Sequence, residues 1–600
     1  MTDDILSADR LLARALAAAG GAAWARVRTL HFAGRLQAGG LSGPYEQWID
    51  LERGRHALQF TLGPATMGGG YDGVRAWQRM ANGEVLAQDS EAALRTAATD
   101  AWINARGWWF PDRHPAAIQT LGRREADGAA FDVLQCVPAR GGRIELWFGA
   151  SSHLLARIVT EVLGKPSLKR LDDHREAQGL RLPFRTTSGS GDPRFDRVVE
   201  VGTVIVDADL QPSTFEPAAQ QVDLHFVDGA RRARLPVHIA NNHVFVAVEL
   251  DGHPLRFILD TGGVNLVTKE AAARLGLRSE GELEGRGPGE TAVSVGFTRV
   301  ARLVIGGQVA LERQLLRVLP MPGFDDVEGA PFDGVLGVEL FRRLVVRIDY
   351  ADAALELIAP DVFDAPADAQ SLPLTFFGHF PGVDGDLDGA KGQFWLDTGN
   401  RGGVFVAGPF AQANGLATRC PTSGLTTIGW GVGGGVEGRL ARGGRLTLGP
   451  IAIDGAVLRL PSEDGGGVMA MRDVAGNVGG EILSRFDVTF DYGRQRVLLV
   501  PNGTHGTPFP ADRAGLWINR RGDDVIVKAV MADGPGAAAG LQVGDVLFDI
   551  DGESAAHLTL DALRRRLRDW PAGKVVALRI ARDGVPFEAA LQLRDLIPAD

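Results

Sequence analysis

Cysteine is nearly absent from this sequence. Cys136 and Cys420 are the two cysteines among 600 residues, which excludes a disulfide framework or a cysteine-based metal site as the basis of the fold. No run approaches roughly 18 uninterrupted apolar residues, so no segment has the sequence of a membrane-spanning helix. At the N-terminus, Arg10 and Arg14 interrupt the apolar stretch ADRLLARALAAAGGAAW. We therefore expect a short amphipathic helix there and no clear signal peptide.

A long basic run is also lacking. The 74 Asp and Glu residues outnumber the 63 Lys and Arg residues, which gives a formal net charge of -11. No nucleic-acid-binding module is recognisable, so we expect no nucleic-acid partner. Glycine, in contrast, is abundant at 79 residues, beside 45% hydrophobic and 23% charged residues. This composition and length predict a globular, multidomain chain that is rich in turns and mainly β.

Residues 24–215 carry short alternating segments such as LHFAGRLQ, HALQFTLG and IELWFGA, which predict antiparallel β structure. Seven tryptophans in this region fit either an aromatic-lined concave sheet or ordinary core packing: Trp24, Trp48, Trp77, Trp102, Trp108, Trp109 and Trp147. The succession GGAAWARVRTLHFAGRL, YDGVRAWQ and IELWFGASSHLLARI resembles the LolA-like lipoprotein-carrier superfamily. That resemblance implies an antiparallel half-barrel over residues 1–215, with a lipid or another apolar molecule as its ligand.

An internal repeat follows the proline-containing, linker-like stretch 206–221. FILDTGGVNLVTKEAAARLGL (257–277) is echoed by FWLDTGNRGGVFVAGPFAQANGL (394–416), and the two aspartates are 137 residues apart. DGVLGVELFRRLVVRIDY (333–350) is echoed by GNVGGEILSRFDVTFDY (476–492). Aligning the closing Asp-Tyr pairs superposes Gly334 on Gly476, Gly337 on Gly479, Glu339 on Glu481, Arg343 on Arg485 and Asp349 on Asp491. The two halves are built to one plan.

The paired Asp-Thr-Gly motifs resemble those of the pepsin and retropepsin superfamily of aspartic proteases, in the bacterial-type form with both lobes on one chain. A single such motif is compatible with a plain β-turn, but a matched pair with a matched distal element is not. The resemblance covers about residues 235–501 and implies one lobe over 222–365 and a second over 370–501.

The resemblance also implies an active site. Asp260 and Asp397 would be the catalytic carboxylates, sharing one proton so that one acts as base and the other as acid. The supporting residues would be Thr261 and Thr398, whose hydroxyls interlock the loops, and Gly262 and Gly399, whose N-H groups face the carboxylates. Family members usually carry Ser, Thr or Ala after the motif. Here Gly263 and Asn400 stand there, so we expect unequal environments for the two aspartates. No metal or cofactor is implied.

Proteases of this type lower a β-hairpin flap over the substrate. Two glycine-rich candidates are GRGPGETAVSVGF (285–297) and TTIGWGVGGGVEGRL (426–440). We favour the second, with Gly429, Trp430 and Gly431, because an aromatic side chain among glycines offers an apolar contact on a mobile hairpin. A flexible surface loop is the alternative in each case.

The C-terminal stretch DGPGAAAGLQVGDVLFDIDGESA (533–555) resembles the HtrA-type PDZ signature and implies a PDZ domain over 513–598. Its peptide-binding loop would be Gly515, Leu516, Trp517 and Ile518, with LDALRRRLRDW (560–570) as the other wall of the groove. Arg564, Arg565 and Arg566 are expected to form a solvated face. A groove closed against the protease lobes is the alternative arrangement.

Together these features predict a mainly β chain: an N-terminal antiparallel half-barrel, a two-lobed retropepsin-like β core and a C-terminal α+β PDZ domain. The expected function is that of an aspartic endopeptidase whose PDZ module binds polypeptide. A peptide-binding protein without activity and an apolar-ligand carrier remain alternatives. Neither H-E-x-x-H nor G-x-S-x-G occurs. The companion domains resemble envelope proteins of bacteria, which points to the periplasm or cell envelope.

Overall fold

The computed structural model describes residues 7–162, 165–189, 191–217, 223–287, 289, 291–462 and 467–597. The expected domain ends 1, 222 and 598, and positions 288 and 290 of the first flap candidate, lie outside this part of the chain. Within it, the α-helices are α1 (Ala8–Ala18), α2 (Glu91–Asn104), α3 (Lys269–Arg274), α4 (Phe324–Glu328), α5 (Val338–Arg343), α6 (Gly408–Ala413), α7 (Leu416–Arg419), α8 (Gly480–Leu483), α9 (Pro535–Ala538) and α10 (Leu560–Asp569). No helix among these residues is long and apolar enough to span a membrane.

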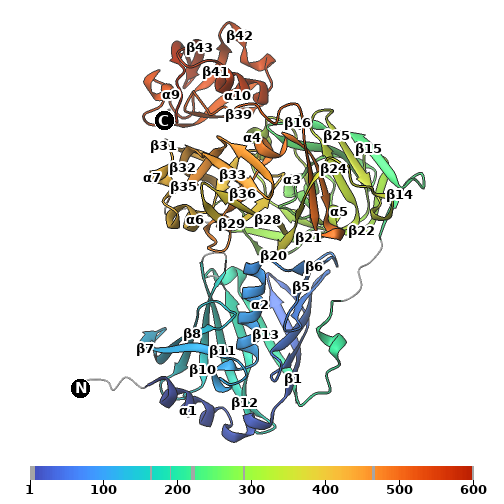
Figure 1. Cartoon of the computed structure of the whole chain (residues 1–600), viewed down its shortest axis with the longest axis vertical. Coiled ribbons are helices and arrows are strands. Elements are labelled where there is room, and N and C mark those ends of the chain that lie inside the picture. Colours follow the sequence, from blue (N-terminus) through green and yellow to red (C-terminus); the bar gives the residue numbers. More distant parts are fainter. Residues whose placement is uncertain are drawn as a thin grey trace.

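The N-terminal region forms one antiparallel sheet that curves around α2 (Figure 1). Its order is β6-β5-β4-β3-β2-β1-β13-β12-β11-β10-β9-β8-β7. The strands are β1 (Thr29–Ala38), β2 (Leu41–Asp50), β3 (Arg55–Leu62), β4 (Ala65–Tyr71), β5 (Ala76–Arg79), β6 (Val85–Gln88), β7 (Ala116–Ala126), β8 (Ala129–Pro138), β9 (Ile144–Gly149), β10 (Leu155–Val162), β11 (Lys165–Ala177), β12 (Leu180–Gly189) and β13 (Arg197–Val206). Two meanders thus meet where β1 pairs with β13.

Four of the seven tryptophans of this region pack together in its core. Trp24, Trp102 and Trp108 are buried, and Trp109 lies against two of them, with ring centroids 4.9 Å from Trp24 and 5.6 Å from Trp108. The cavity beside this cluster has a volume of about 30 Å³. That volume is of the order of one water molecule. In this conformation the space beside the cluster is too small for an acyl chain.

The first lobe is built on the sheet β14-β22-β19-β23-β18-β17-β21-β20, with β16 pairing β17. Its strands are β14 (Leu224–Phe226), β16 (His238–Ala240), β17 (His243–Leu250), β18 (His253–Leu259), β19 (Leu266–Thr268), β20 (Glu280–Gly285), β21 (Val293–Ile305), β22 (Val309–Leu319) and β23 (Gly334–Leu336). Strand β23 inserts between β18, to which it is parallel, and β19, to which it is antiparallel.

The second lobe repeats this arrangement on the sheet β31-β32-β35-β30-β36-β29-β28-β33-β34, with β27 pairing β28. Its strands are β27 (Thr375–Phe377), β28 (Phe380–Leu387), β29 (Ala390–Leu396), β30 (Val404–Val406), β31 (Thr422–Gly431), β32 (Gly434–Arg442), β33 (Arg445–Leu448), β34 (Ile451–Asp454), β35 (Val457–Pro461) and β36 (Gly476–Val478). Strand β36 lies between β29 and β30 as β23 lies between β18 and β19. The repeat seen in the sequence is therefore a repeat of topology.

A central sheet, ordered β15-β25-β24-β37-β38-β26, joins the lobes. Its strands are β15 (Arg232–Pro236), β24 (Val345–Asp349), β25 (Ala354–Ile358), β26 (Gln370–Pro373), β37 (Phe486–Asp491) and β38 (Arg496–Pro501). Strands β24 and β37, which are repeat counterparts, pair antiparallel with Arg347 opposite Thr489. Because the same alignment equates Arg347 with Thr489, this pair marks a pseudo-twofold axis between the lobes.

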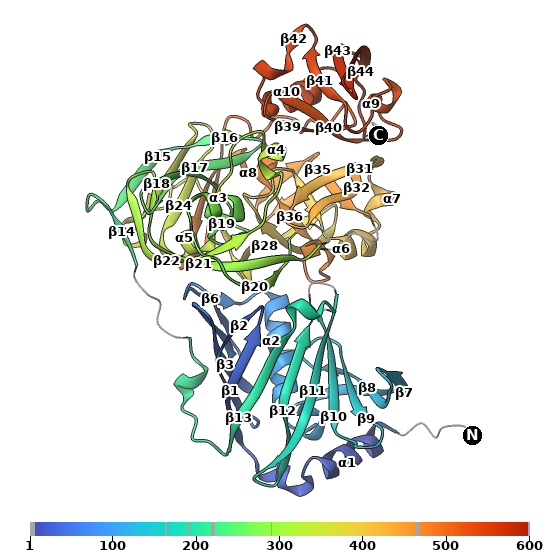
Figure 2. The ribbon, with the colours of Figure 1, turned by 180° about the vertical axis from the view of Figure 1, so that it is seen from behind.

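The C-terminal sheet is ordered β39-β40-β41-β43-β44, with β42 pairing β41. Its strands are β39 (Leu516–Arg521), β40 (Asp524–Val530), β41 (Val546–Ile550), β42 (Glu553–Ser554), β43 (Val575–Arg582) and β44 (Val585–Gln592). Seen from both sides, the N-terminal half-barrel lies at one end of the molecule, the two lobes in the middle and the C-terminal domain at the other end (Figures 1 and 2). The expected mainly β fold class is confirmed.

Candidate active site

Asp260 and Asp397 each follow directly on a buried strand, β18 or β29. The inserted neighbouring strand holds each of them in place, because the Asp260 N-H donates to the Leu336 carbonyl and the Asp397 N-H to the Val478 carbonyl, both at 2.9 Å. The ladder hydrogen bonds thus extend to the aspartates themselves, and the chain turns immediately afterwards. This geometry fixes both side chains at the seam between the lobes.

The two threonines interlock the loops across that seam. The Thr261 N-H donates to Thr398 Oγ1 at 3.1 Å, and the Thr398 N-H donates to Thr261 Oγ1 at 3.0 Å. Each hydroxyl then donates across the seam, Thr261 to the Leu396 carbonyl at 2.7 Å and Thr398 to the Leu259 carbonyl at 2.8 Å. Both threonines are fully buried. This reciprocal set of hydrogen bonds holds the aspartate loops at a fixed separation.

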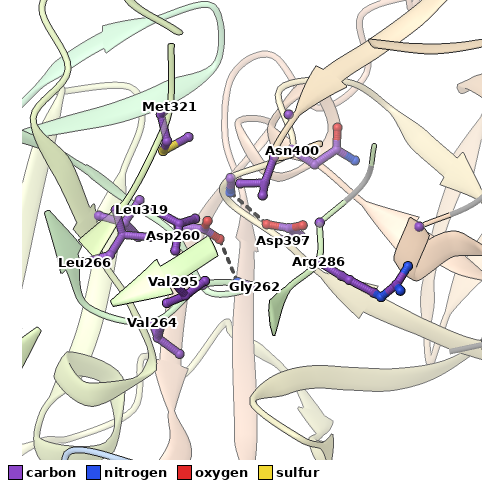
Figure 3. A pocket seen from close by; sticks show the side chains of 18 of the residues that line it. Asp260, Gly262, Val264, Leu266, Arg286, Val295, Leu319, Met321, Asp397 and Asn400 are labelled. Atoms are coloured by element: carbon purple, nitrogen blue, oxygen red, sulfur yellow. Dashed lines mark hydrogen bonds between the residues drawn. The ribbon is translucent and has the colours of Figure 1, made fainter. Parts of the chain in front are cut away.

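The two carboxylates face each other across the loops (Figure 3). The Gly262 N-H donates to Asp260 Oδ1, and the Gly399 N-H donates to Asp397 Oδ1, both at 2.8 Å. A Cβ on Gly262 would lie 2.9 Å from the Asp397 carboxyl group, and one on Gly399 would lie 2.4 Å from the Asp260 Cγ. A side chain at either position would therefore collide with the opposite carboxylate. Glycine is required at both because of this close approach.

The environments of the two aspartates differ through one residue. In the second lobe, Asn477 Nδ2 donates to Asp397 Oδ2 at 2.5 Å. Asn400 Nδ2 in turn donates to Asn477 Oδ1 at 3.0 Å, which turns the amide nitrogen of Asn477 toward the carboxylate. In the first lobe the counterpart of Asn477 is Val335, which has no hydrogen-bond donor in its side chain. Asp397 therefore accepts a side-chain hydrogen bond that has no equivalent at Asp260.

Proton occupancy follows from these contacts. Burial raises the pKa of Asp260 well above its usual range, and the charge of Asp397 and a hydrogen bond with it raise that pKa further. The N-H groups of Gly262 and Gly399 are equivalent and do not distinguish the two carboxyls, whereas the Asn477 amide donates to Asp397 alone. Burial and the neighbouring carboxylate thus favour the protonated form of Asp260.

A histidine from each lobe supports the aspartate loop of the other lobe. The His243 Nε2 of the first lobe lies 2.9 Å from the Gly399 carbonyl oxygen, and the His379 Nε2 of the second lobe lies 2.9 Å from the Gly262 carbonyl oxygen. A carbonyl only accepts, so both rings donate from Nε2. The two residues are 136 positions apart, close to the spacing of the aspartates. They extend the pseudo-twofold arrangement beyond the motifs.

The two histidines differ in their surroundings. Nδ1 of His243 lies 3.0 Å from the buried carboxylate of Glu328, and the proximity of His243 helps to lower the pKa of Glu328 to about 2 against the opposing effect of burial. Among the residues that the structure describes, no carboxylate is paired with His379. Burial, together with the nearby Arg317 guanidinium, lowers the pKa of His379 to about 4. His379 is therefore a neutral donor at the pH values at which a protein is usually handled.

Both flap candidates are hairpins, and their tips meet. The second is formed by β31 and β32, with Trp430 opposite Gly435 and the turn at Val432 and Gly433. The first is formed by β20 and β21. The Gly289 N-H in the first tip donates to the Val432 carbonyl in the second at 3.0 Å. Each lobe thus contributes one hairpin, and the second, with Gly429, Trp430 and Gly431, remains the favoured flap.

The dyad lies in a cavity of about 630 Å³. Both hairpins line it, through Arg286 and Gly287 on one side and Gly429, Trp430 and Gly431 on the other. The rim of the N-terminal half-barrel lines it as well, through Pro166, Ser167, Ser188, Gly189, Phe195 and Arg197. Figure 3 shows Leu266, Leu319 and Met321 around Asp260. A cavity of this size accommodates several side chains of an extended peptide.

The expected peptide-binding loop of the C-terminal domain lies outside this cavity. Other residues of the chain form hydrogen bonds with backbone groups of this loop. The N-H groups of Ala514 and Gly515 donate to the carboxylate of Asp512 at 3.1 and 2.9 Å. Arg564 in α10 donates to the Ile518 carbonyl at 2.7 Å, on the edge strand β39. An internal carboxylate thus occupies the loop expected to bind a terminal carboxylate.

Helix α4 of the first lobe lies against β39 (Figure 1). Arg521 of β39 pairs with Asp326 of α4 at 2.8 Å, and Arg564 also donates to Asn241 Oδ1 at 2.9 Å. Arg564 is therefore an interdomain contact, which differs from the solvated face expected for it. Its neighbour Arg565 is exposed, as expected. The first lobe therefore packs against β39, the edge strand of the expected groove.

A chain of contacts leads from this domain to the dyad. The Arg401 guanidinium lies over the Trp517 ring, with its carbon 4.6 Å from the ring centroid. Arg401 also pairs at 3.9 Å with Glu328, which contacts His243, the donor to Gly399. Trp517 and the aspartate loop of the second lobe thus share a continuous set of polar contacts.

The structure brings six of the expected site residues together: Asp260, Thr261, Gly262, Asp397, Thr398 and Gly399. Asn400 contacts the site through Asn477. Sequence reasoning missed Asn477, His243 and His379. Asn477 could have been found from the alignment of GVLG with GNVG, because a polar residue replaces an apolar one there in a buried element. In the part of the chain that the structure describes, no three His, Cys, Asp or Glu side chains are grouped so as to hold a metal ion.

Solved structures similar to this chain include a LolA superfamily protein from Nitrosomonas europaea and a DUF1329 family protein from Desulfovibrio piger. The first is 15% identical, and the match covers 35% of this chain and 97% of that chain with a TM-score of 0.26. The second is 12% identical, with 36% and 99% covered and a TM-score of 0.26. The LolA superfamily expected from the sequence is thus among these structures.

A comparison with curated proteins returns no significant match. Family models match two stretches of the chain. Residues 246–340 match the model described as aspartyl protease, and residues 526–582 match the model described as PDZ domain. The first stretch contains Asp260, and the second lies within the C-terminal sheet. The chain therefore carries an aspartyl protease-like domain and a PDZ domain.

Proposed function

We propose that this chain is an aspartic endopeptidase that hydrolyses peptide bonds with a water molecule activated between Asp260 and Asp397. The observation that carries the proposal is the unequal pairing of the dyad. Asn477 donates a hydrogen bond to Asp397, while burial and the charge of Asp397 favour the protonated form of Asp260. Acid and base are thus present together in one site at the same pH.

Each group has a distinct role in the proposed reaction. Asp397 takes a proton from water, whose oxygen bonds to the carbonyl carbon of the substrate, while Asp260 donates its proton to the carbonyl oxygen. The resulting gem-diol collapses when Asp397 passes its proton to the leaving nitrogen and a hydroxyl proton returns to Asp260. The C-N bond breaks, and the dyad regains its starting protonation state. No covalent intermediate with the enzyme is formed.

The flaps determine how a substrate enters. Their tips are joined by the Gly289 N-H and the Val432 carbonyl, so an extended chain enters only when the tips separate. The edges of β20 and β31 then offer backbone groups for β-augmentation of the substrate. We infer that the PDZ module also binds polypeptide, and that a ligand there replaces the Asp512 carboxylate and the Arg564 guanidinium as hydrogen-bond partners.

The test uses the full-length chain and reduced, unfolded casein. Fragments identified by mass spectrometry in ¹⁸O-labelled water should carry one label in each new carboxyl terminus, since water attacks directly. A peptide with a central hydroxyl in place of the scissile amide should inhibit cleavage, because it mimics the gem-diol. Cleavage that persists in the presence of this mimic, or an intact substrate after prolonged incubation across pH 3–8, would count against the proposal.

A further inference from the structure

Two arginines occupy equivalent positions in the two lobes. Arg317 on β22 pairs in register with Leu266 on β19, and Arg459 on β35 pairs with Phe405 on β30. Leu266 lies opposite Val335 in the inserted strand, and Phe405 lies opposite Asn477. Because Val335 and Asn477 are repeat counterparts, Leu266 corresponds to Phe405. Arg317 and Arg459 are therefore related by the pseudo-twofold axis.

Both arginines face the cavity of the dyad. Side chains in register on neighbouring strands lie on the same face of a sheet, and all four residues of the two pairs line the cavity. Arg317 is close enough to His379 to lower the pKa of that ring, which places its charge beside the aspartate loop of the first lobe. Arg459 packs against the backbone of Gly402, where a Cβ would lie 2.3 Å from its Cζ. One cation thus flanks the dyad on each side.

Among the residues that the structure describes, neither arginine forms an ion pair with a carboxylate. Arg317 has an electrostatic interaction with Glu339, but no carboxylate lies within ion-pair distance. Arg459 donates from Nη1 to the Ile428 carbonyl at 2.9 Å, while its buried Nε has no partner. Arg317 interacts electrostatically with Glu339 and Arg459 with the equivalent Glu481, and burial raises the pKa of each glutamate, which disfavours their charged forms.

Burying a cation without a paired anion costs free energy, and that cost is relieved when a carboxylate binds. Burial accordingly lowers the pKa of Arg459 to about 10 and lowers the pKa of Arg317. Arg286 also lines the cavity, but Glu284 pairs with it at 2.5 Å, so its charge is already balanced. Among the cavity-lining arginines on the strands of the two lobes that the structure describes, Arg317 and Arg459 are thus a pseudo-twofold pair without an ion-pair partner.

The following inference rests on the proposed function. We propose that Arg317 and Arg459 select acidic polypeptides by binding substrate carboxylates at equivalent distances on the two sides of the scissile bond. An extended substrate bound across the axis presents side chains of the same face to both lobes, so one arginine meets each half of the substrate. The guanidinium group suits this role because it binds carboxylates bidentately.

The test compares two labelled octapeptides on the full-length chain. Both have a Leu-Phe centre and a flanking Gly at each end; one carries Glu-Glu on each side of the centre, and the other carries Gln-Gln. Binding is measured by fluorescence anisotropy and cleavage by kcat/KM. Charge-assisted hydrogen bonds favour the Glu peptide by about tenfold or more in each quantity. The double variant Arg317→Met, Arg459→Met retains the apolar stems and should reduce this ratio to about one. Arg256→Met, an exposed position on β18, is the matched control and should keep the ratio.

The outcomes separate the two proposals. Preferential binding of the Glu peptide without cleavage of either peptide would support the selection of acidic chains and contradict the proteolytic function. Equal cleavage of both peptides by the wild-type chain would support proteolysis and overturn the role of the arginines. A preference that persists in the double variant would also overturn it, because the selectivity would then reside elsewhere.

Discussion

Asn477 donates a hydrogen bond to Asp397 at 2.5 Å, while its repeat counterpart in the other lobe is a valine. This contact breaks the symmetry of an otherwise symmetric dyad. Two carboxylates in identical surroundings would have no preferred holder of the shared proton. Here the Asn477 amide donates to Asp397 alone, while burial and the charge of Asp397 favour the protonated form of Asp260.

Replacing Asn477 with valine removes that donor and restores the symmetry of the site. Because the ionised form of Asp397 loses a hydrogen bond, both apparent pKa values of the dyad should rise. The acidic limb of the pH-rate profile should move upward by about one pH unit. A pH series of kcat/KM measures this shift. Val335→Ala, at the equivalent position, is the control and should leave the profile in place; an unchanged profile in Asn477→Val would show that the amide does not set the proton position.

His379 makes the fold sensitive to acid. Its pKa in the folded chain is about 4, below the usual value of 6.5, so folding favours the neutral ring. The stability this provides is fully present above about pH 6.5 and is lost as the pH falls toward 4. His379→Gln retains a donor for the Gly262 carbonyl but takes up no proton. We expect the fall in Tm between pH 7 and pH 4.5 to be smaller in this variant by roughly 2–4 °C. An identical fall in both chains, measured by calorimetry, would contradict this role.

Contact between the flap tips depends on small residues. A Cβ on Gly289 would lie 2.2 Å from the Gly433 carbonyl carbon, so Gly289→Val should hold the tips apart. Since the flaps then close poorly over a substrate, kcat/KM should fall about tenfold or more while Tm changes little. Gly503→Val is the control, because nothing lies within 4 Å of that position. Wild-type kcat/KM in Gly289→Val would mean that contact between the tips is not needed for turnover.

Arg564 ties the PDZ domain to the first lobe. Arg564→Met removes the donors to Asn241 and Ile518, which should expose the edge of β39. Hydrogen exchange of the β39 amides should become about tenfold faster. Arg565→Met changes an exposed arginine of the same helix and should leave the exchange rates as they are. Equal rates in both variants would show that other contacts hold the groove against the lobe.

The dyad could be predicted from the sequence because its signal is local and is repeated. The Asp-Thr-Gly motifs that contain Asp260 and Asp397 each follow an apolar strand. The distal glycines recur at a matching distance, so the topology of one lobe predicts that of the other. The interlocked threonines followed from the same resemblance. The mainly β fold was evident from alternation and glycine content.

Other features depend on contacts between distant segments, which local patterns do not encode. Arg317 and Arg459 lie in strands without a shared motif, and their equivalence appears only from the strand register. The interdomain contact of Arg564 depends on Asn241, which is far from it in the sequence. Helical amphipathicity alone therefore predicted a solvated face. The meeting of the two flap tips likewise requires both lobes to be in place.

The most direct test of the central claim is the cleavage of unfolded casein by Asp260→Asn and Asp397→Asn beside the wild-type chain, with Tm recorded for all three. Removal of either carboxylate eliminates the acid or the base, so each variant should lose activity by about a thousandfold or more. Asp260→Asn should also be more stable than the wild-type chain at pH 8, because folding favours the neutral form of the Asp260 carboxyl and the amide that replaces it carries no charge. Near-wild-type turnover in either folded variant would contradict the assignment of the dyad.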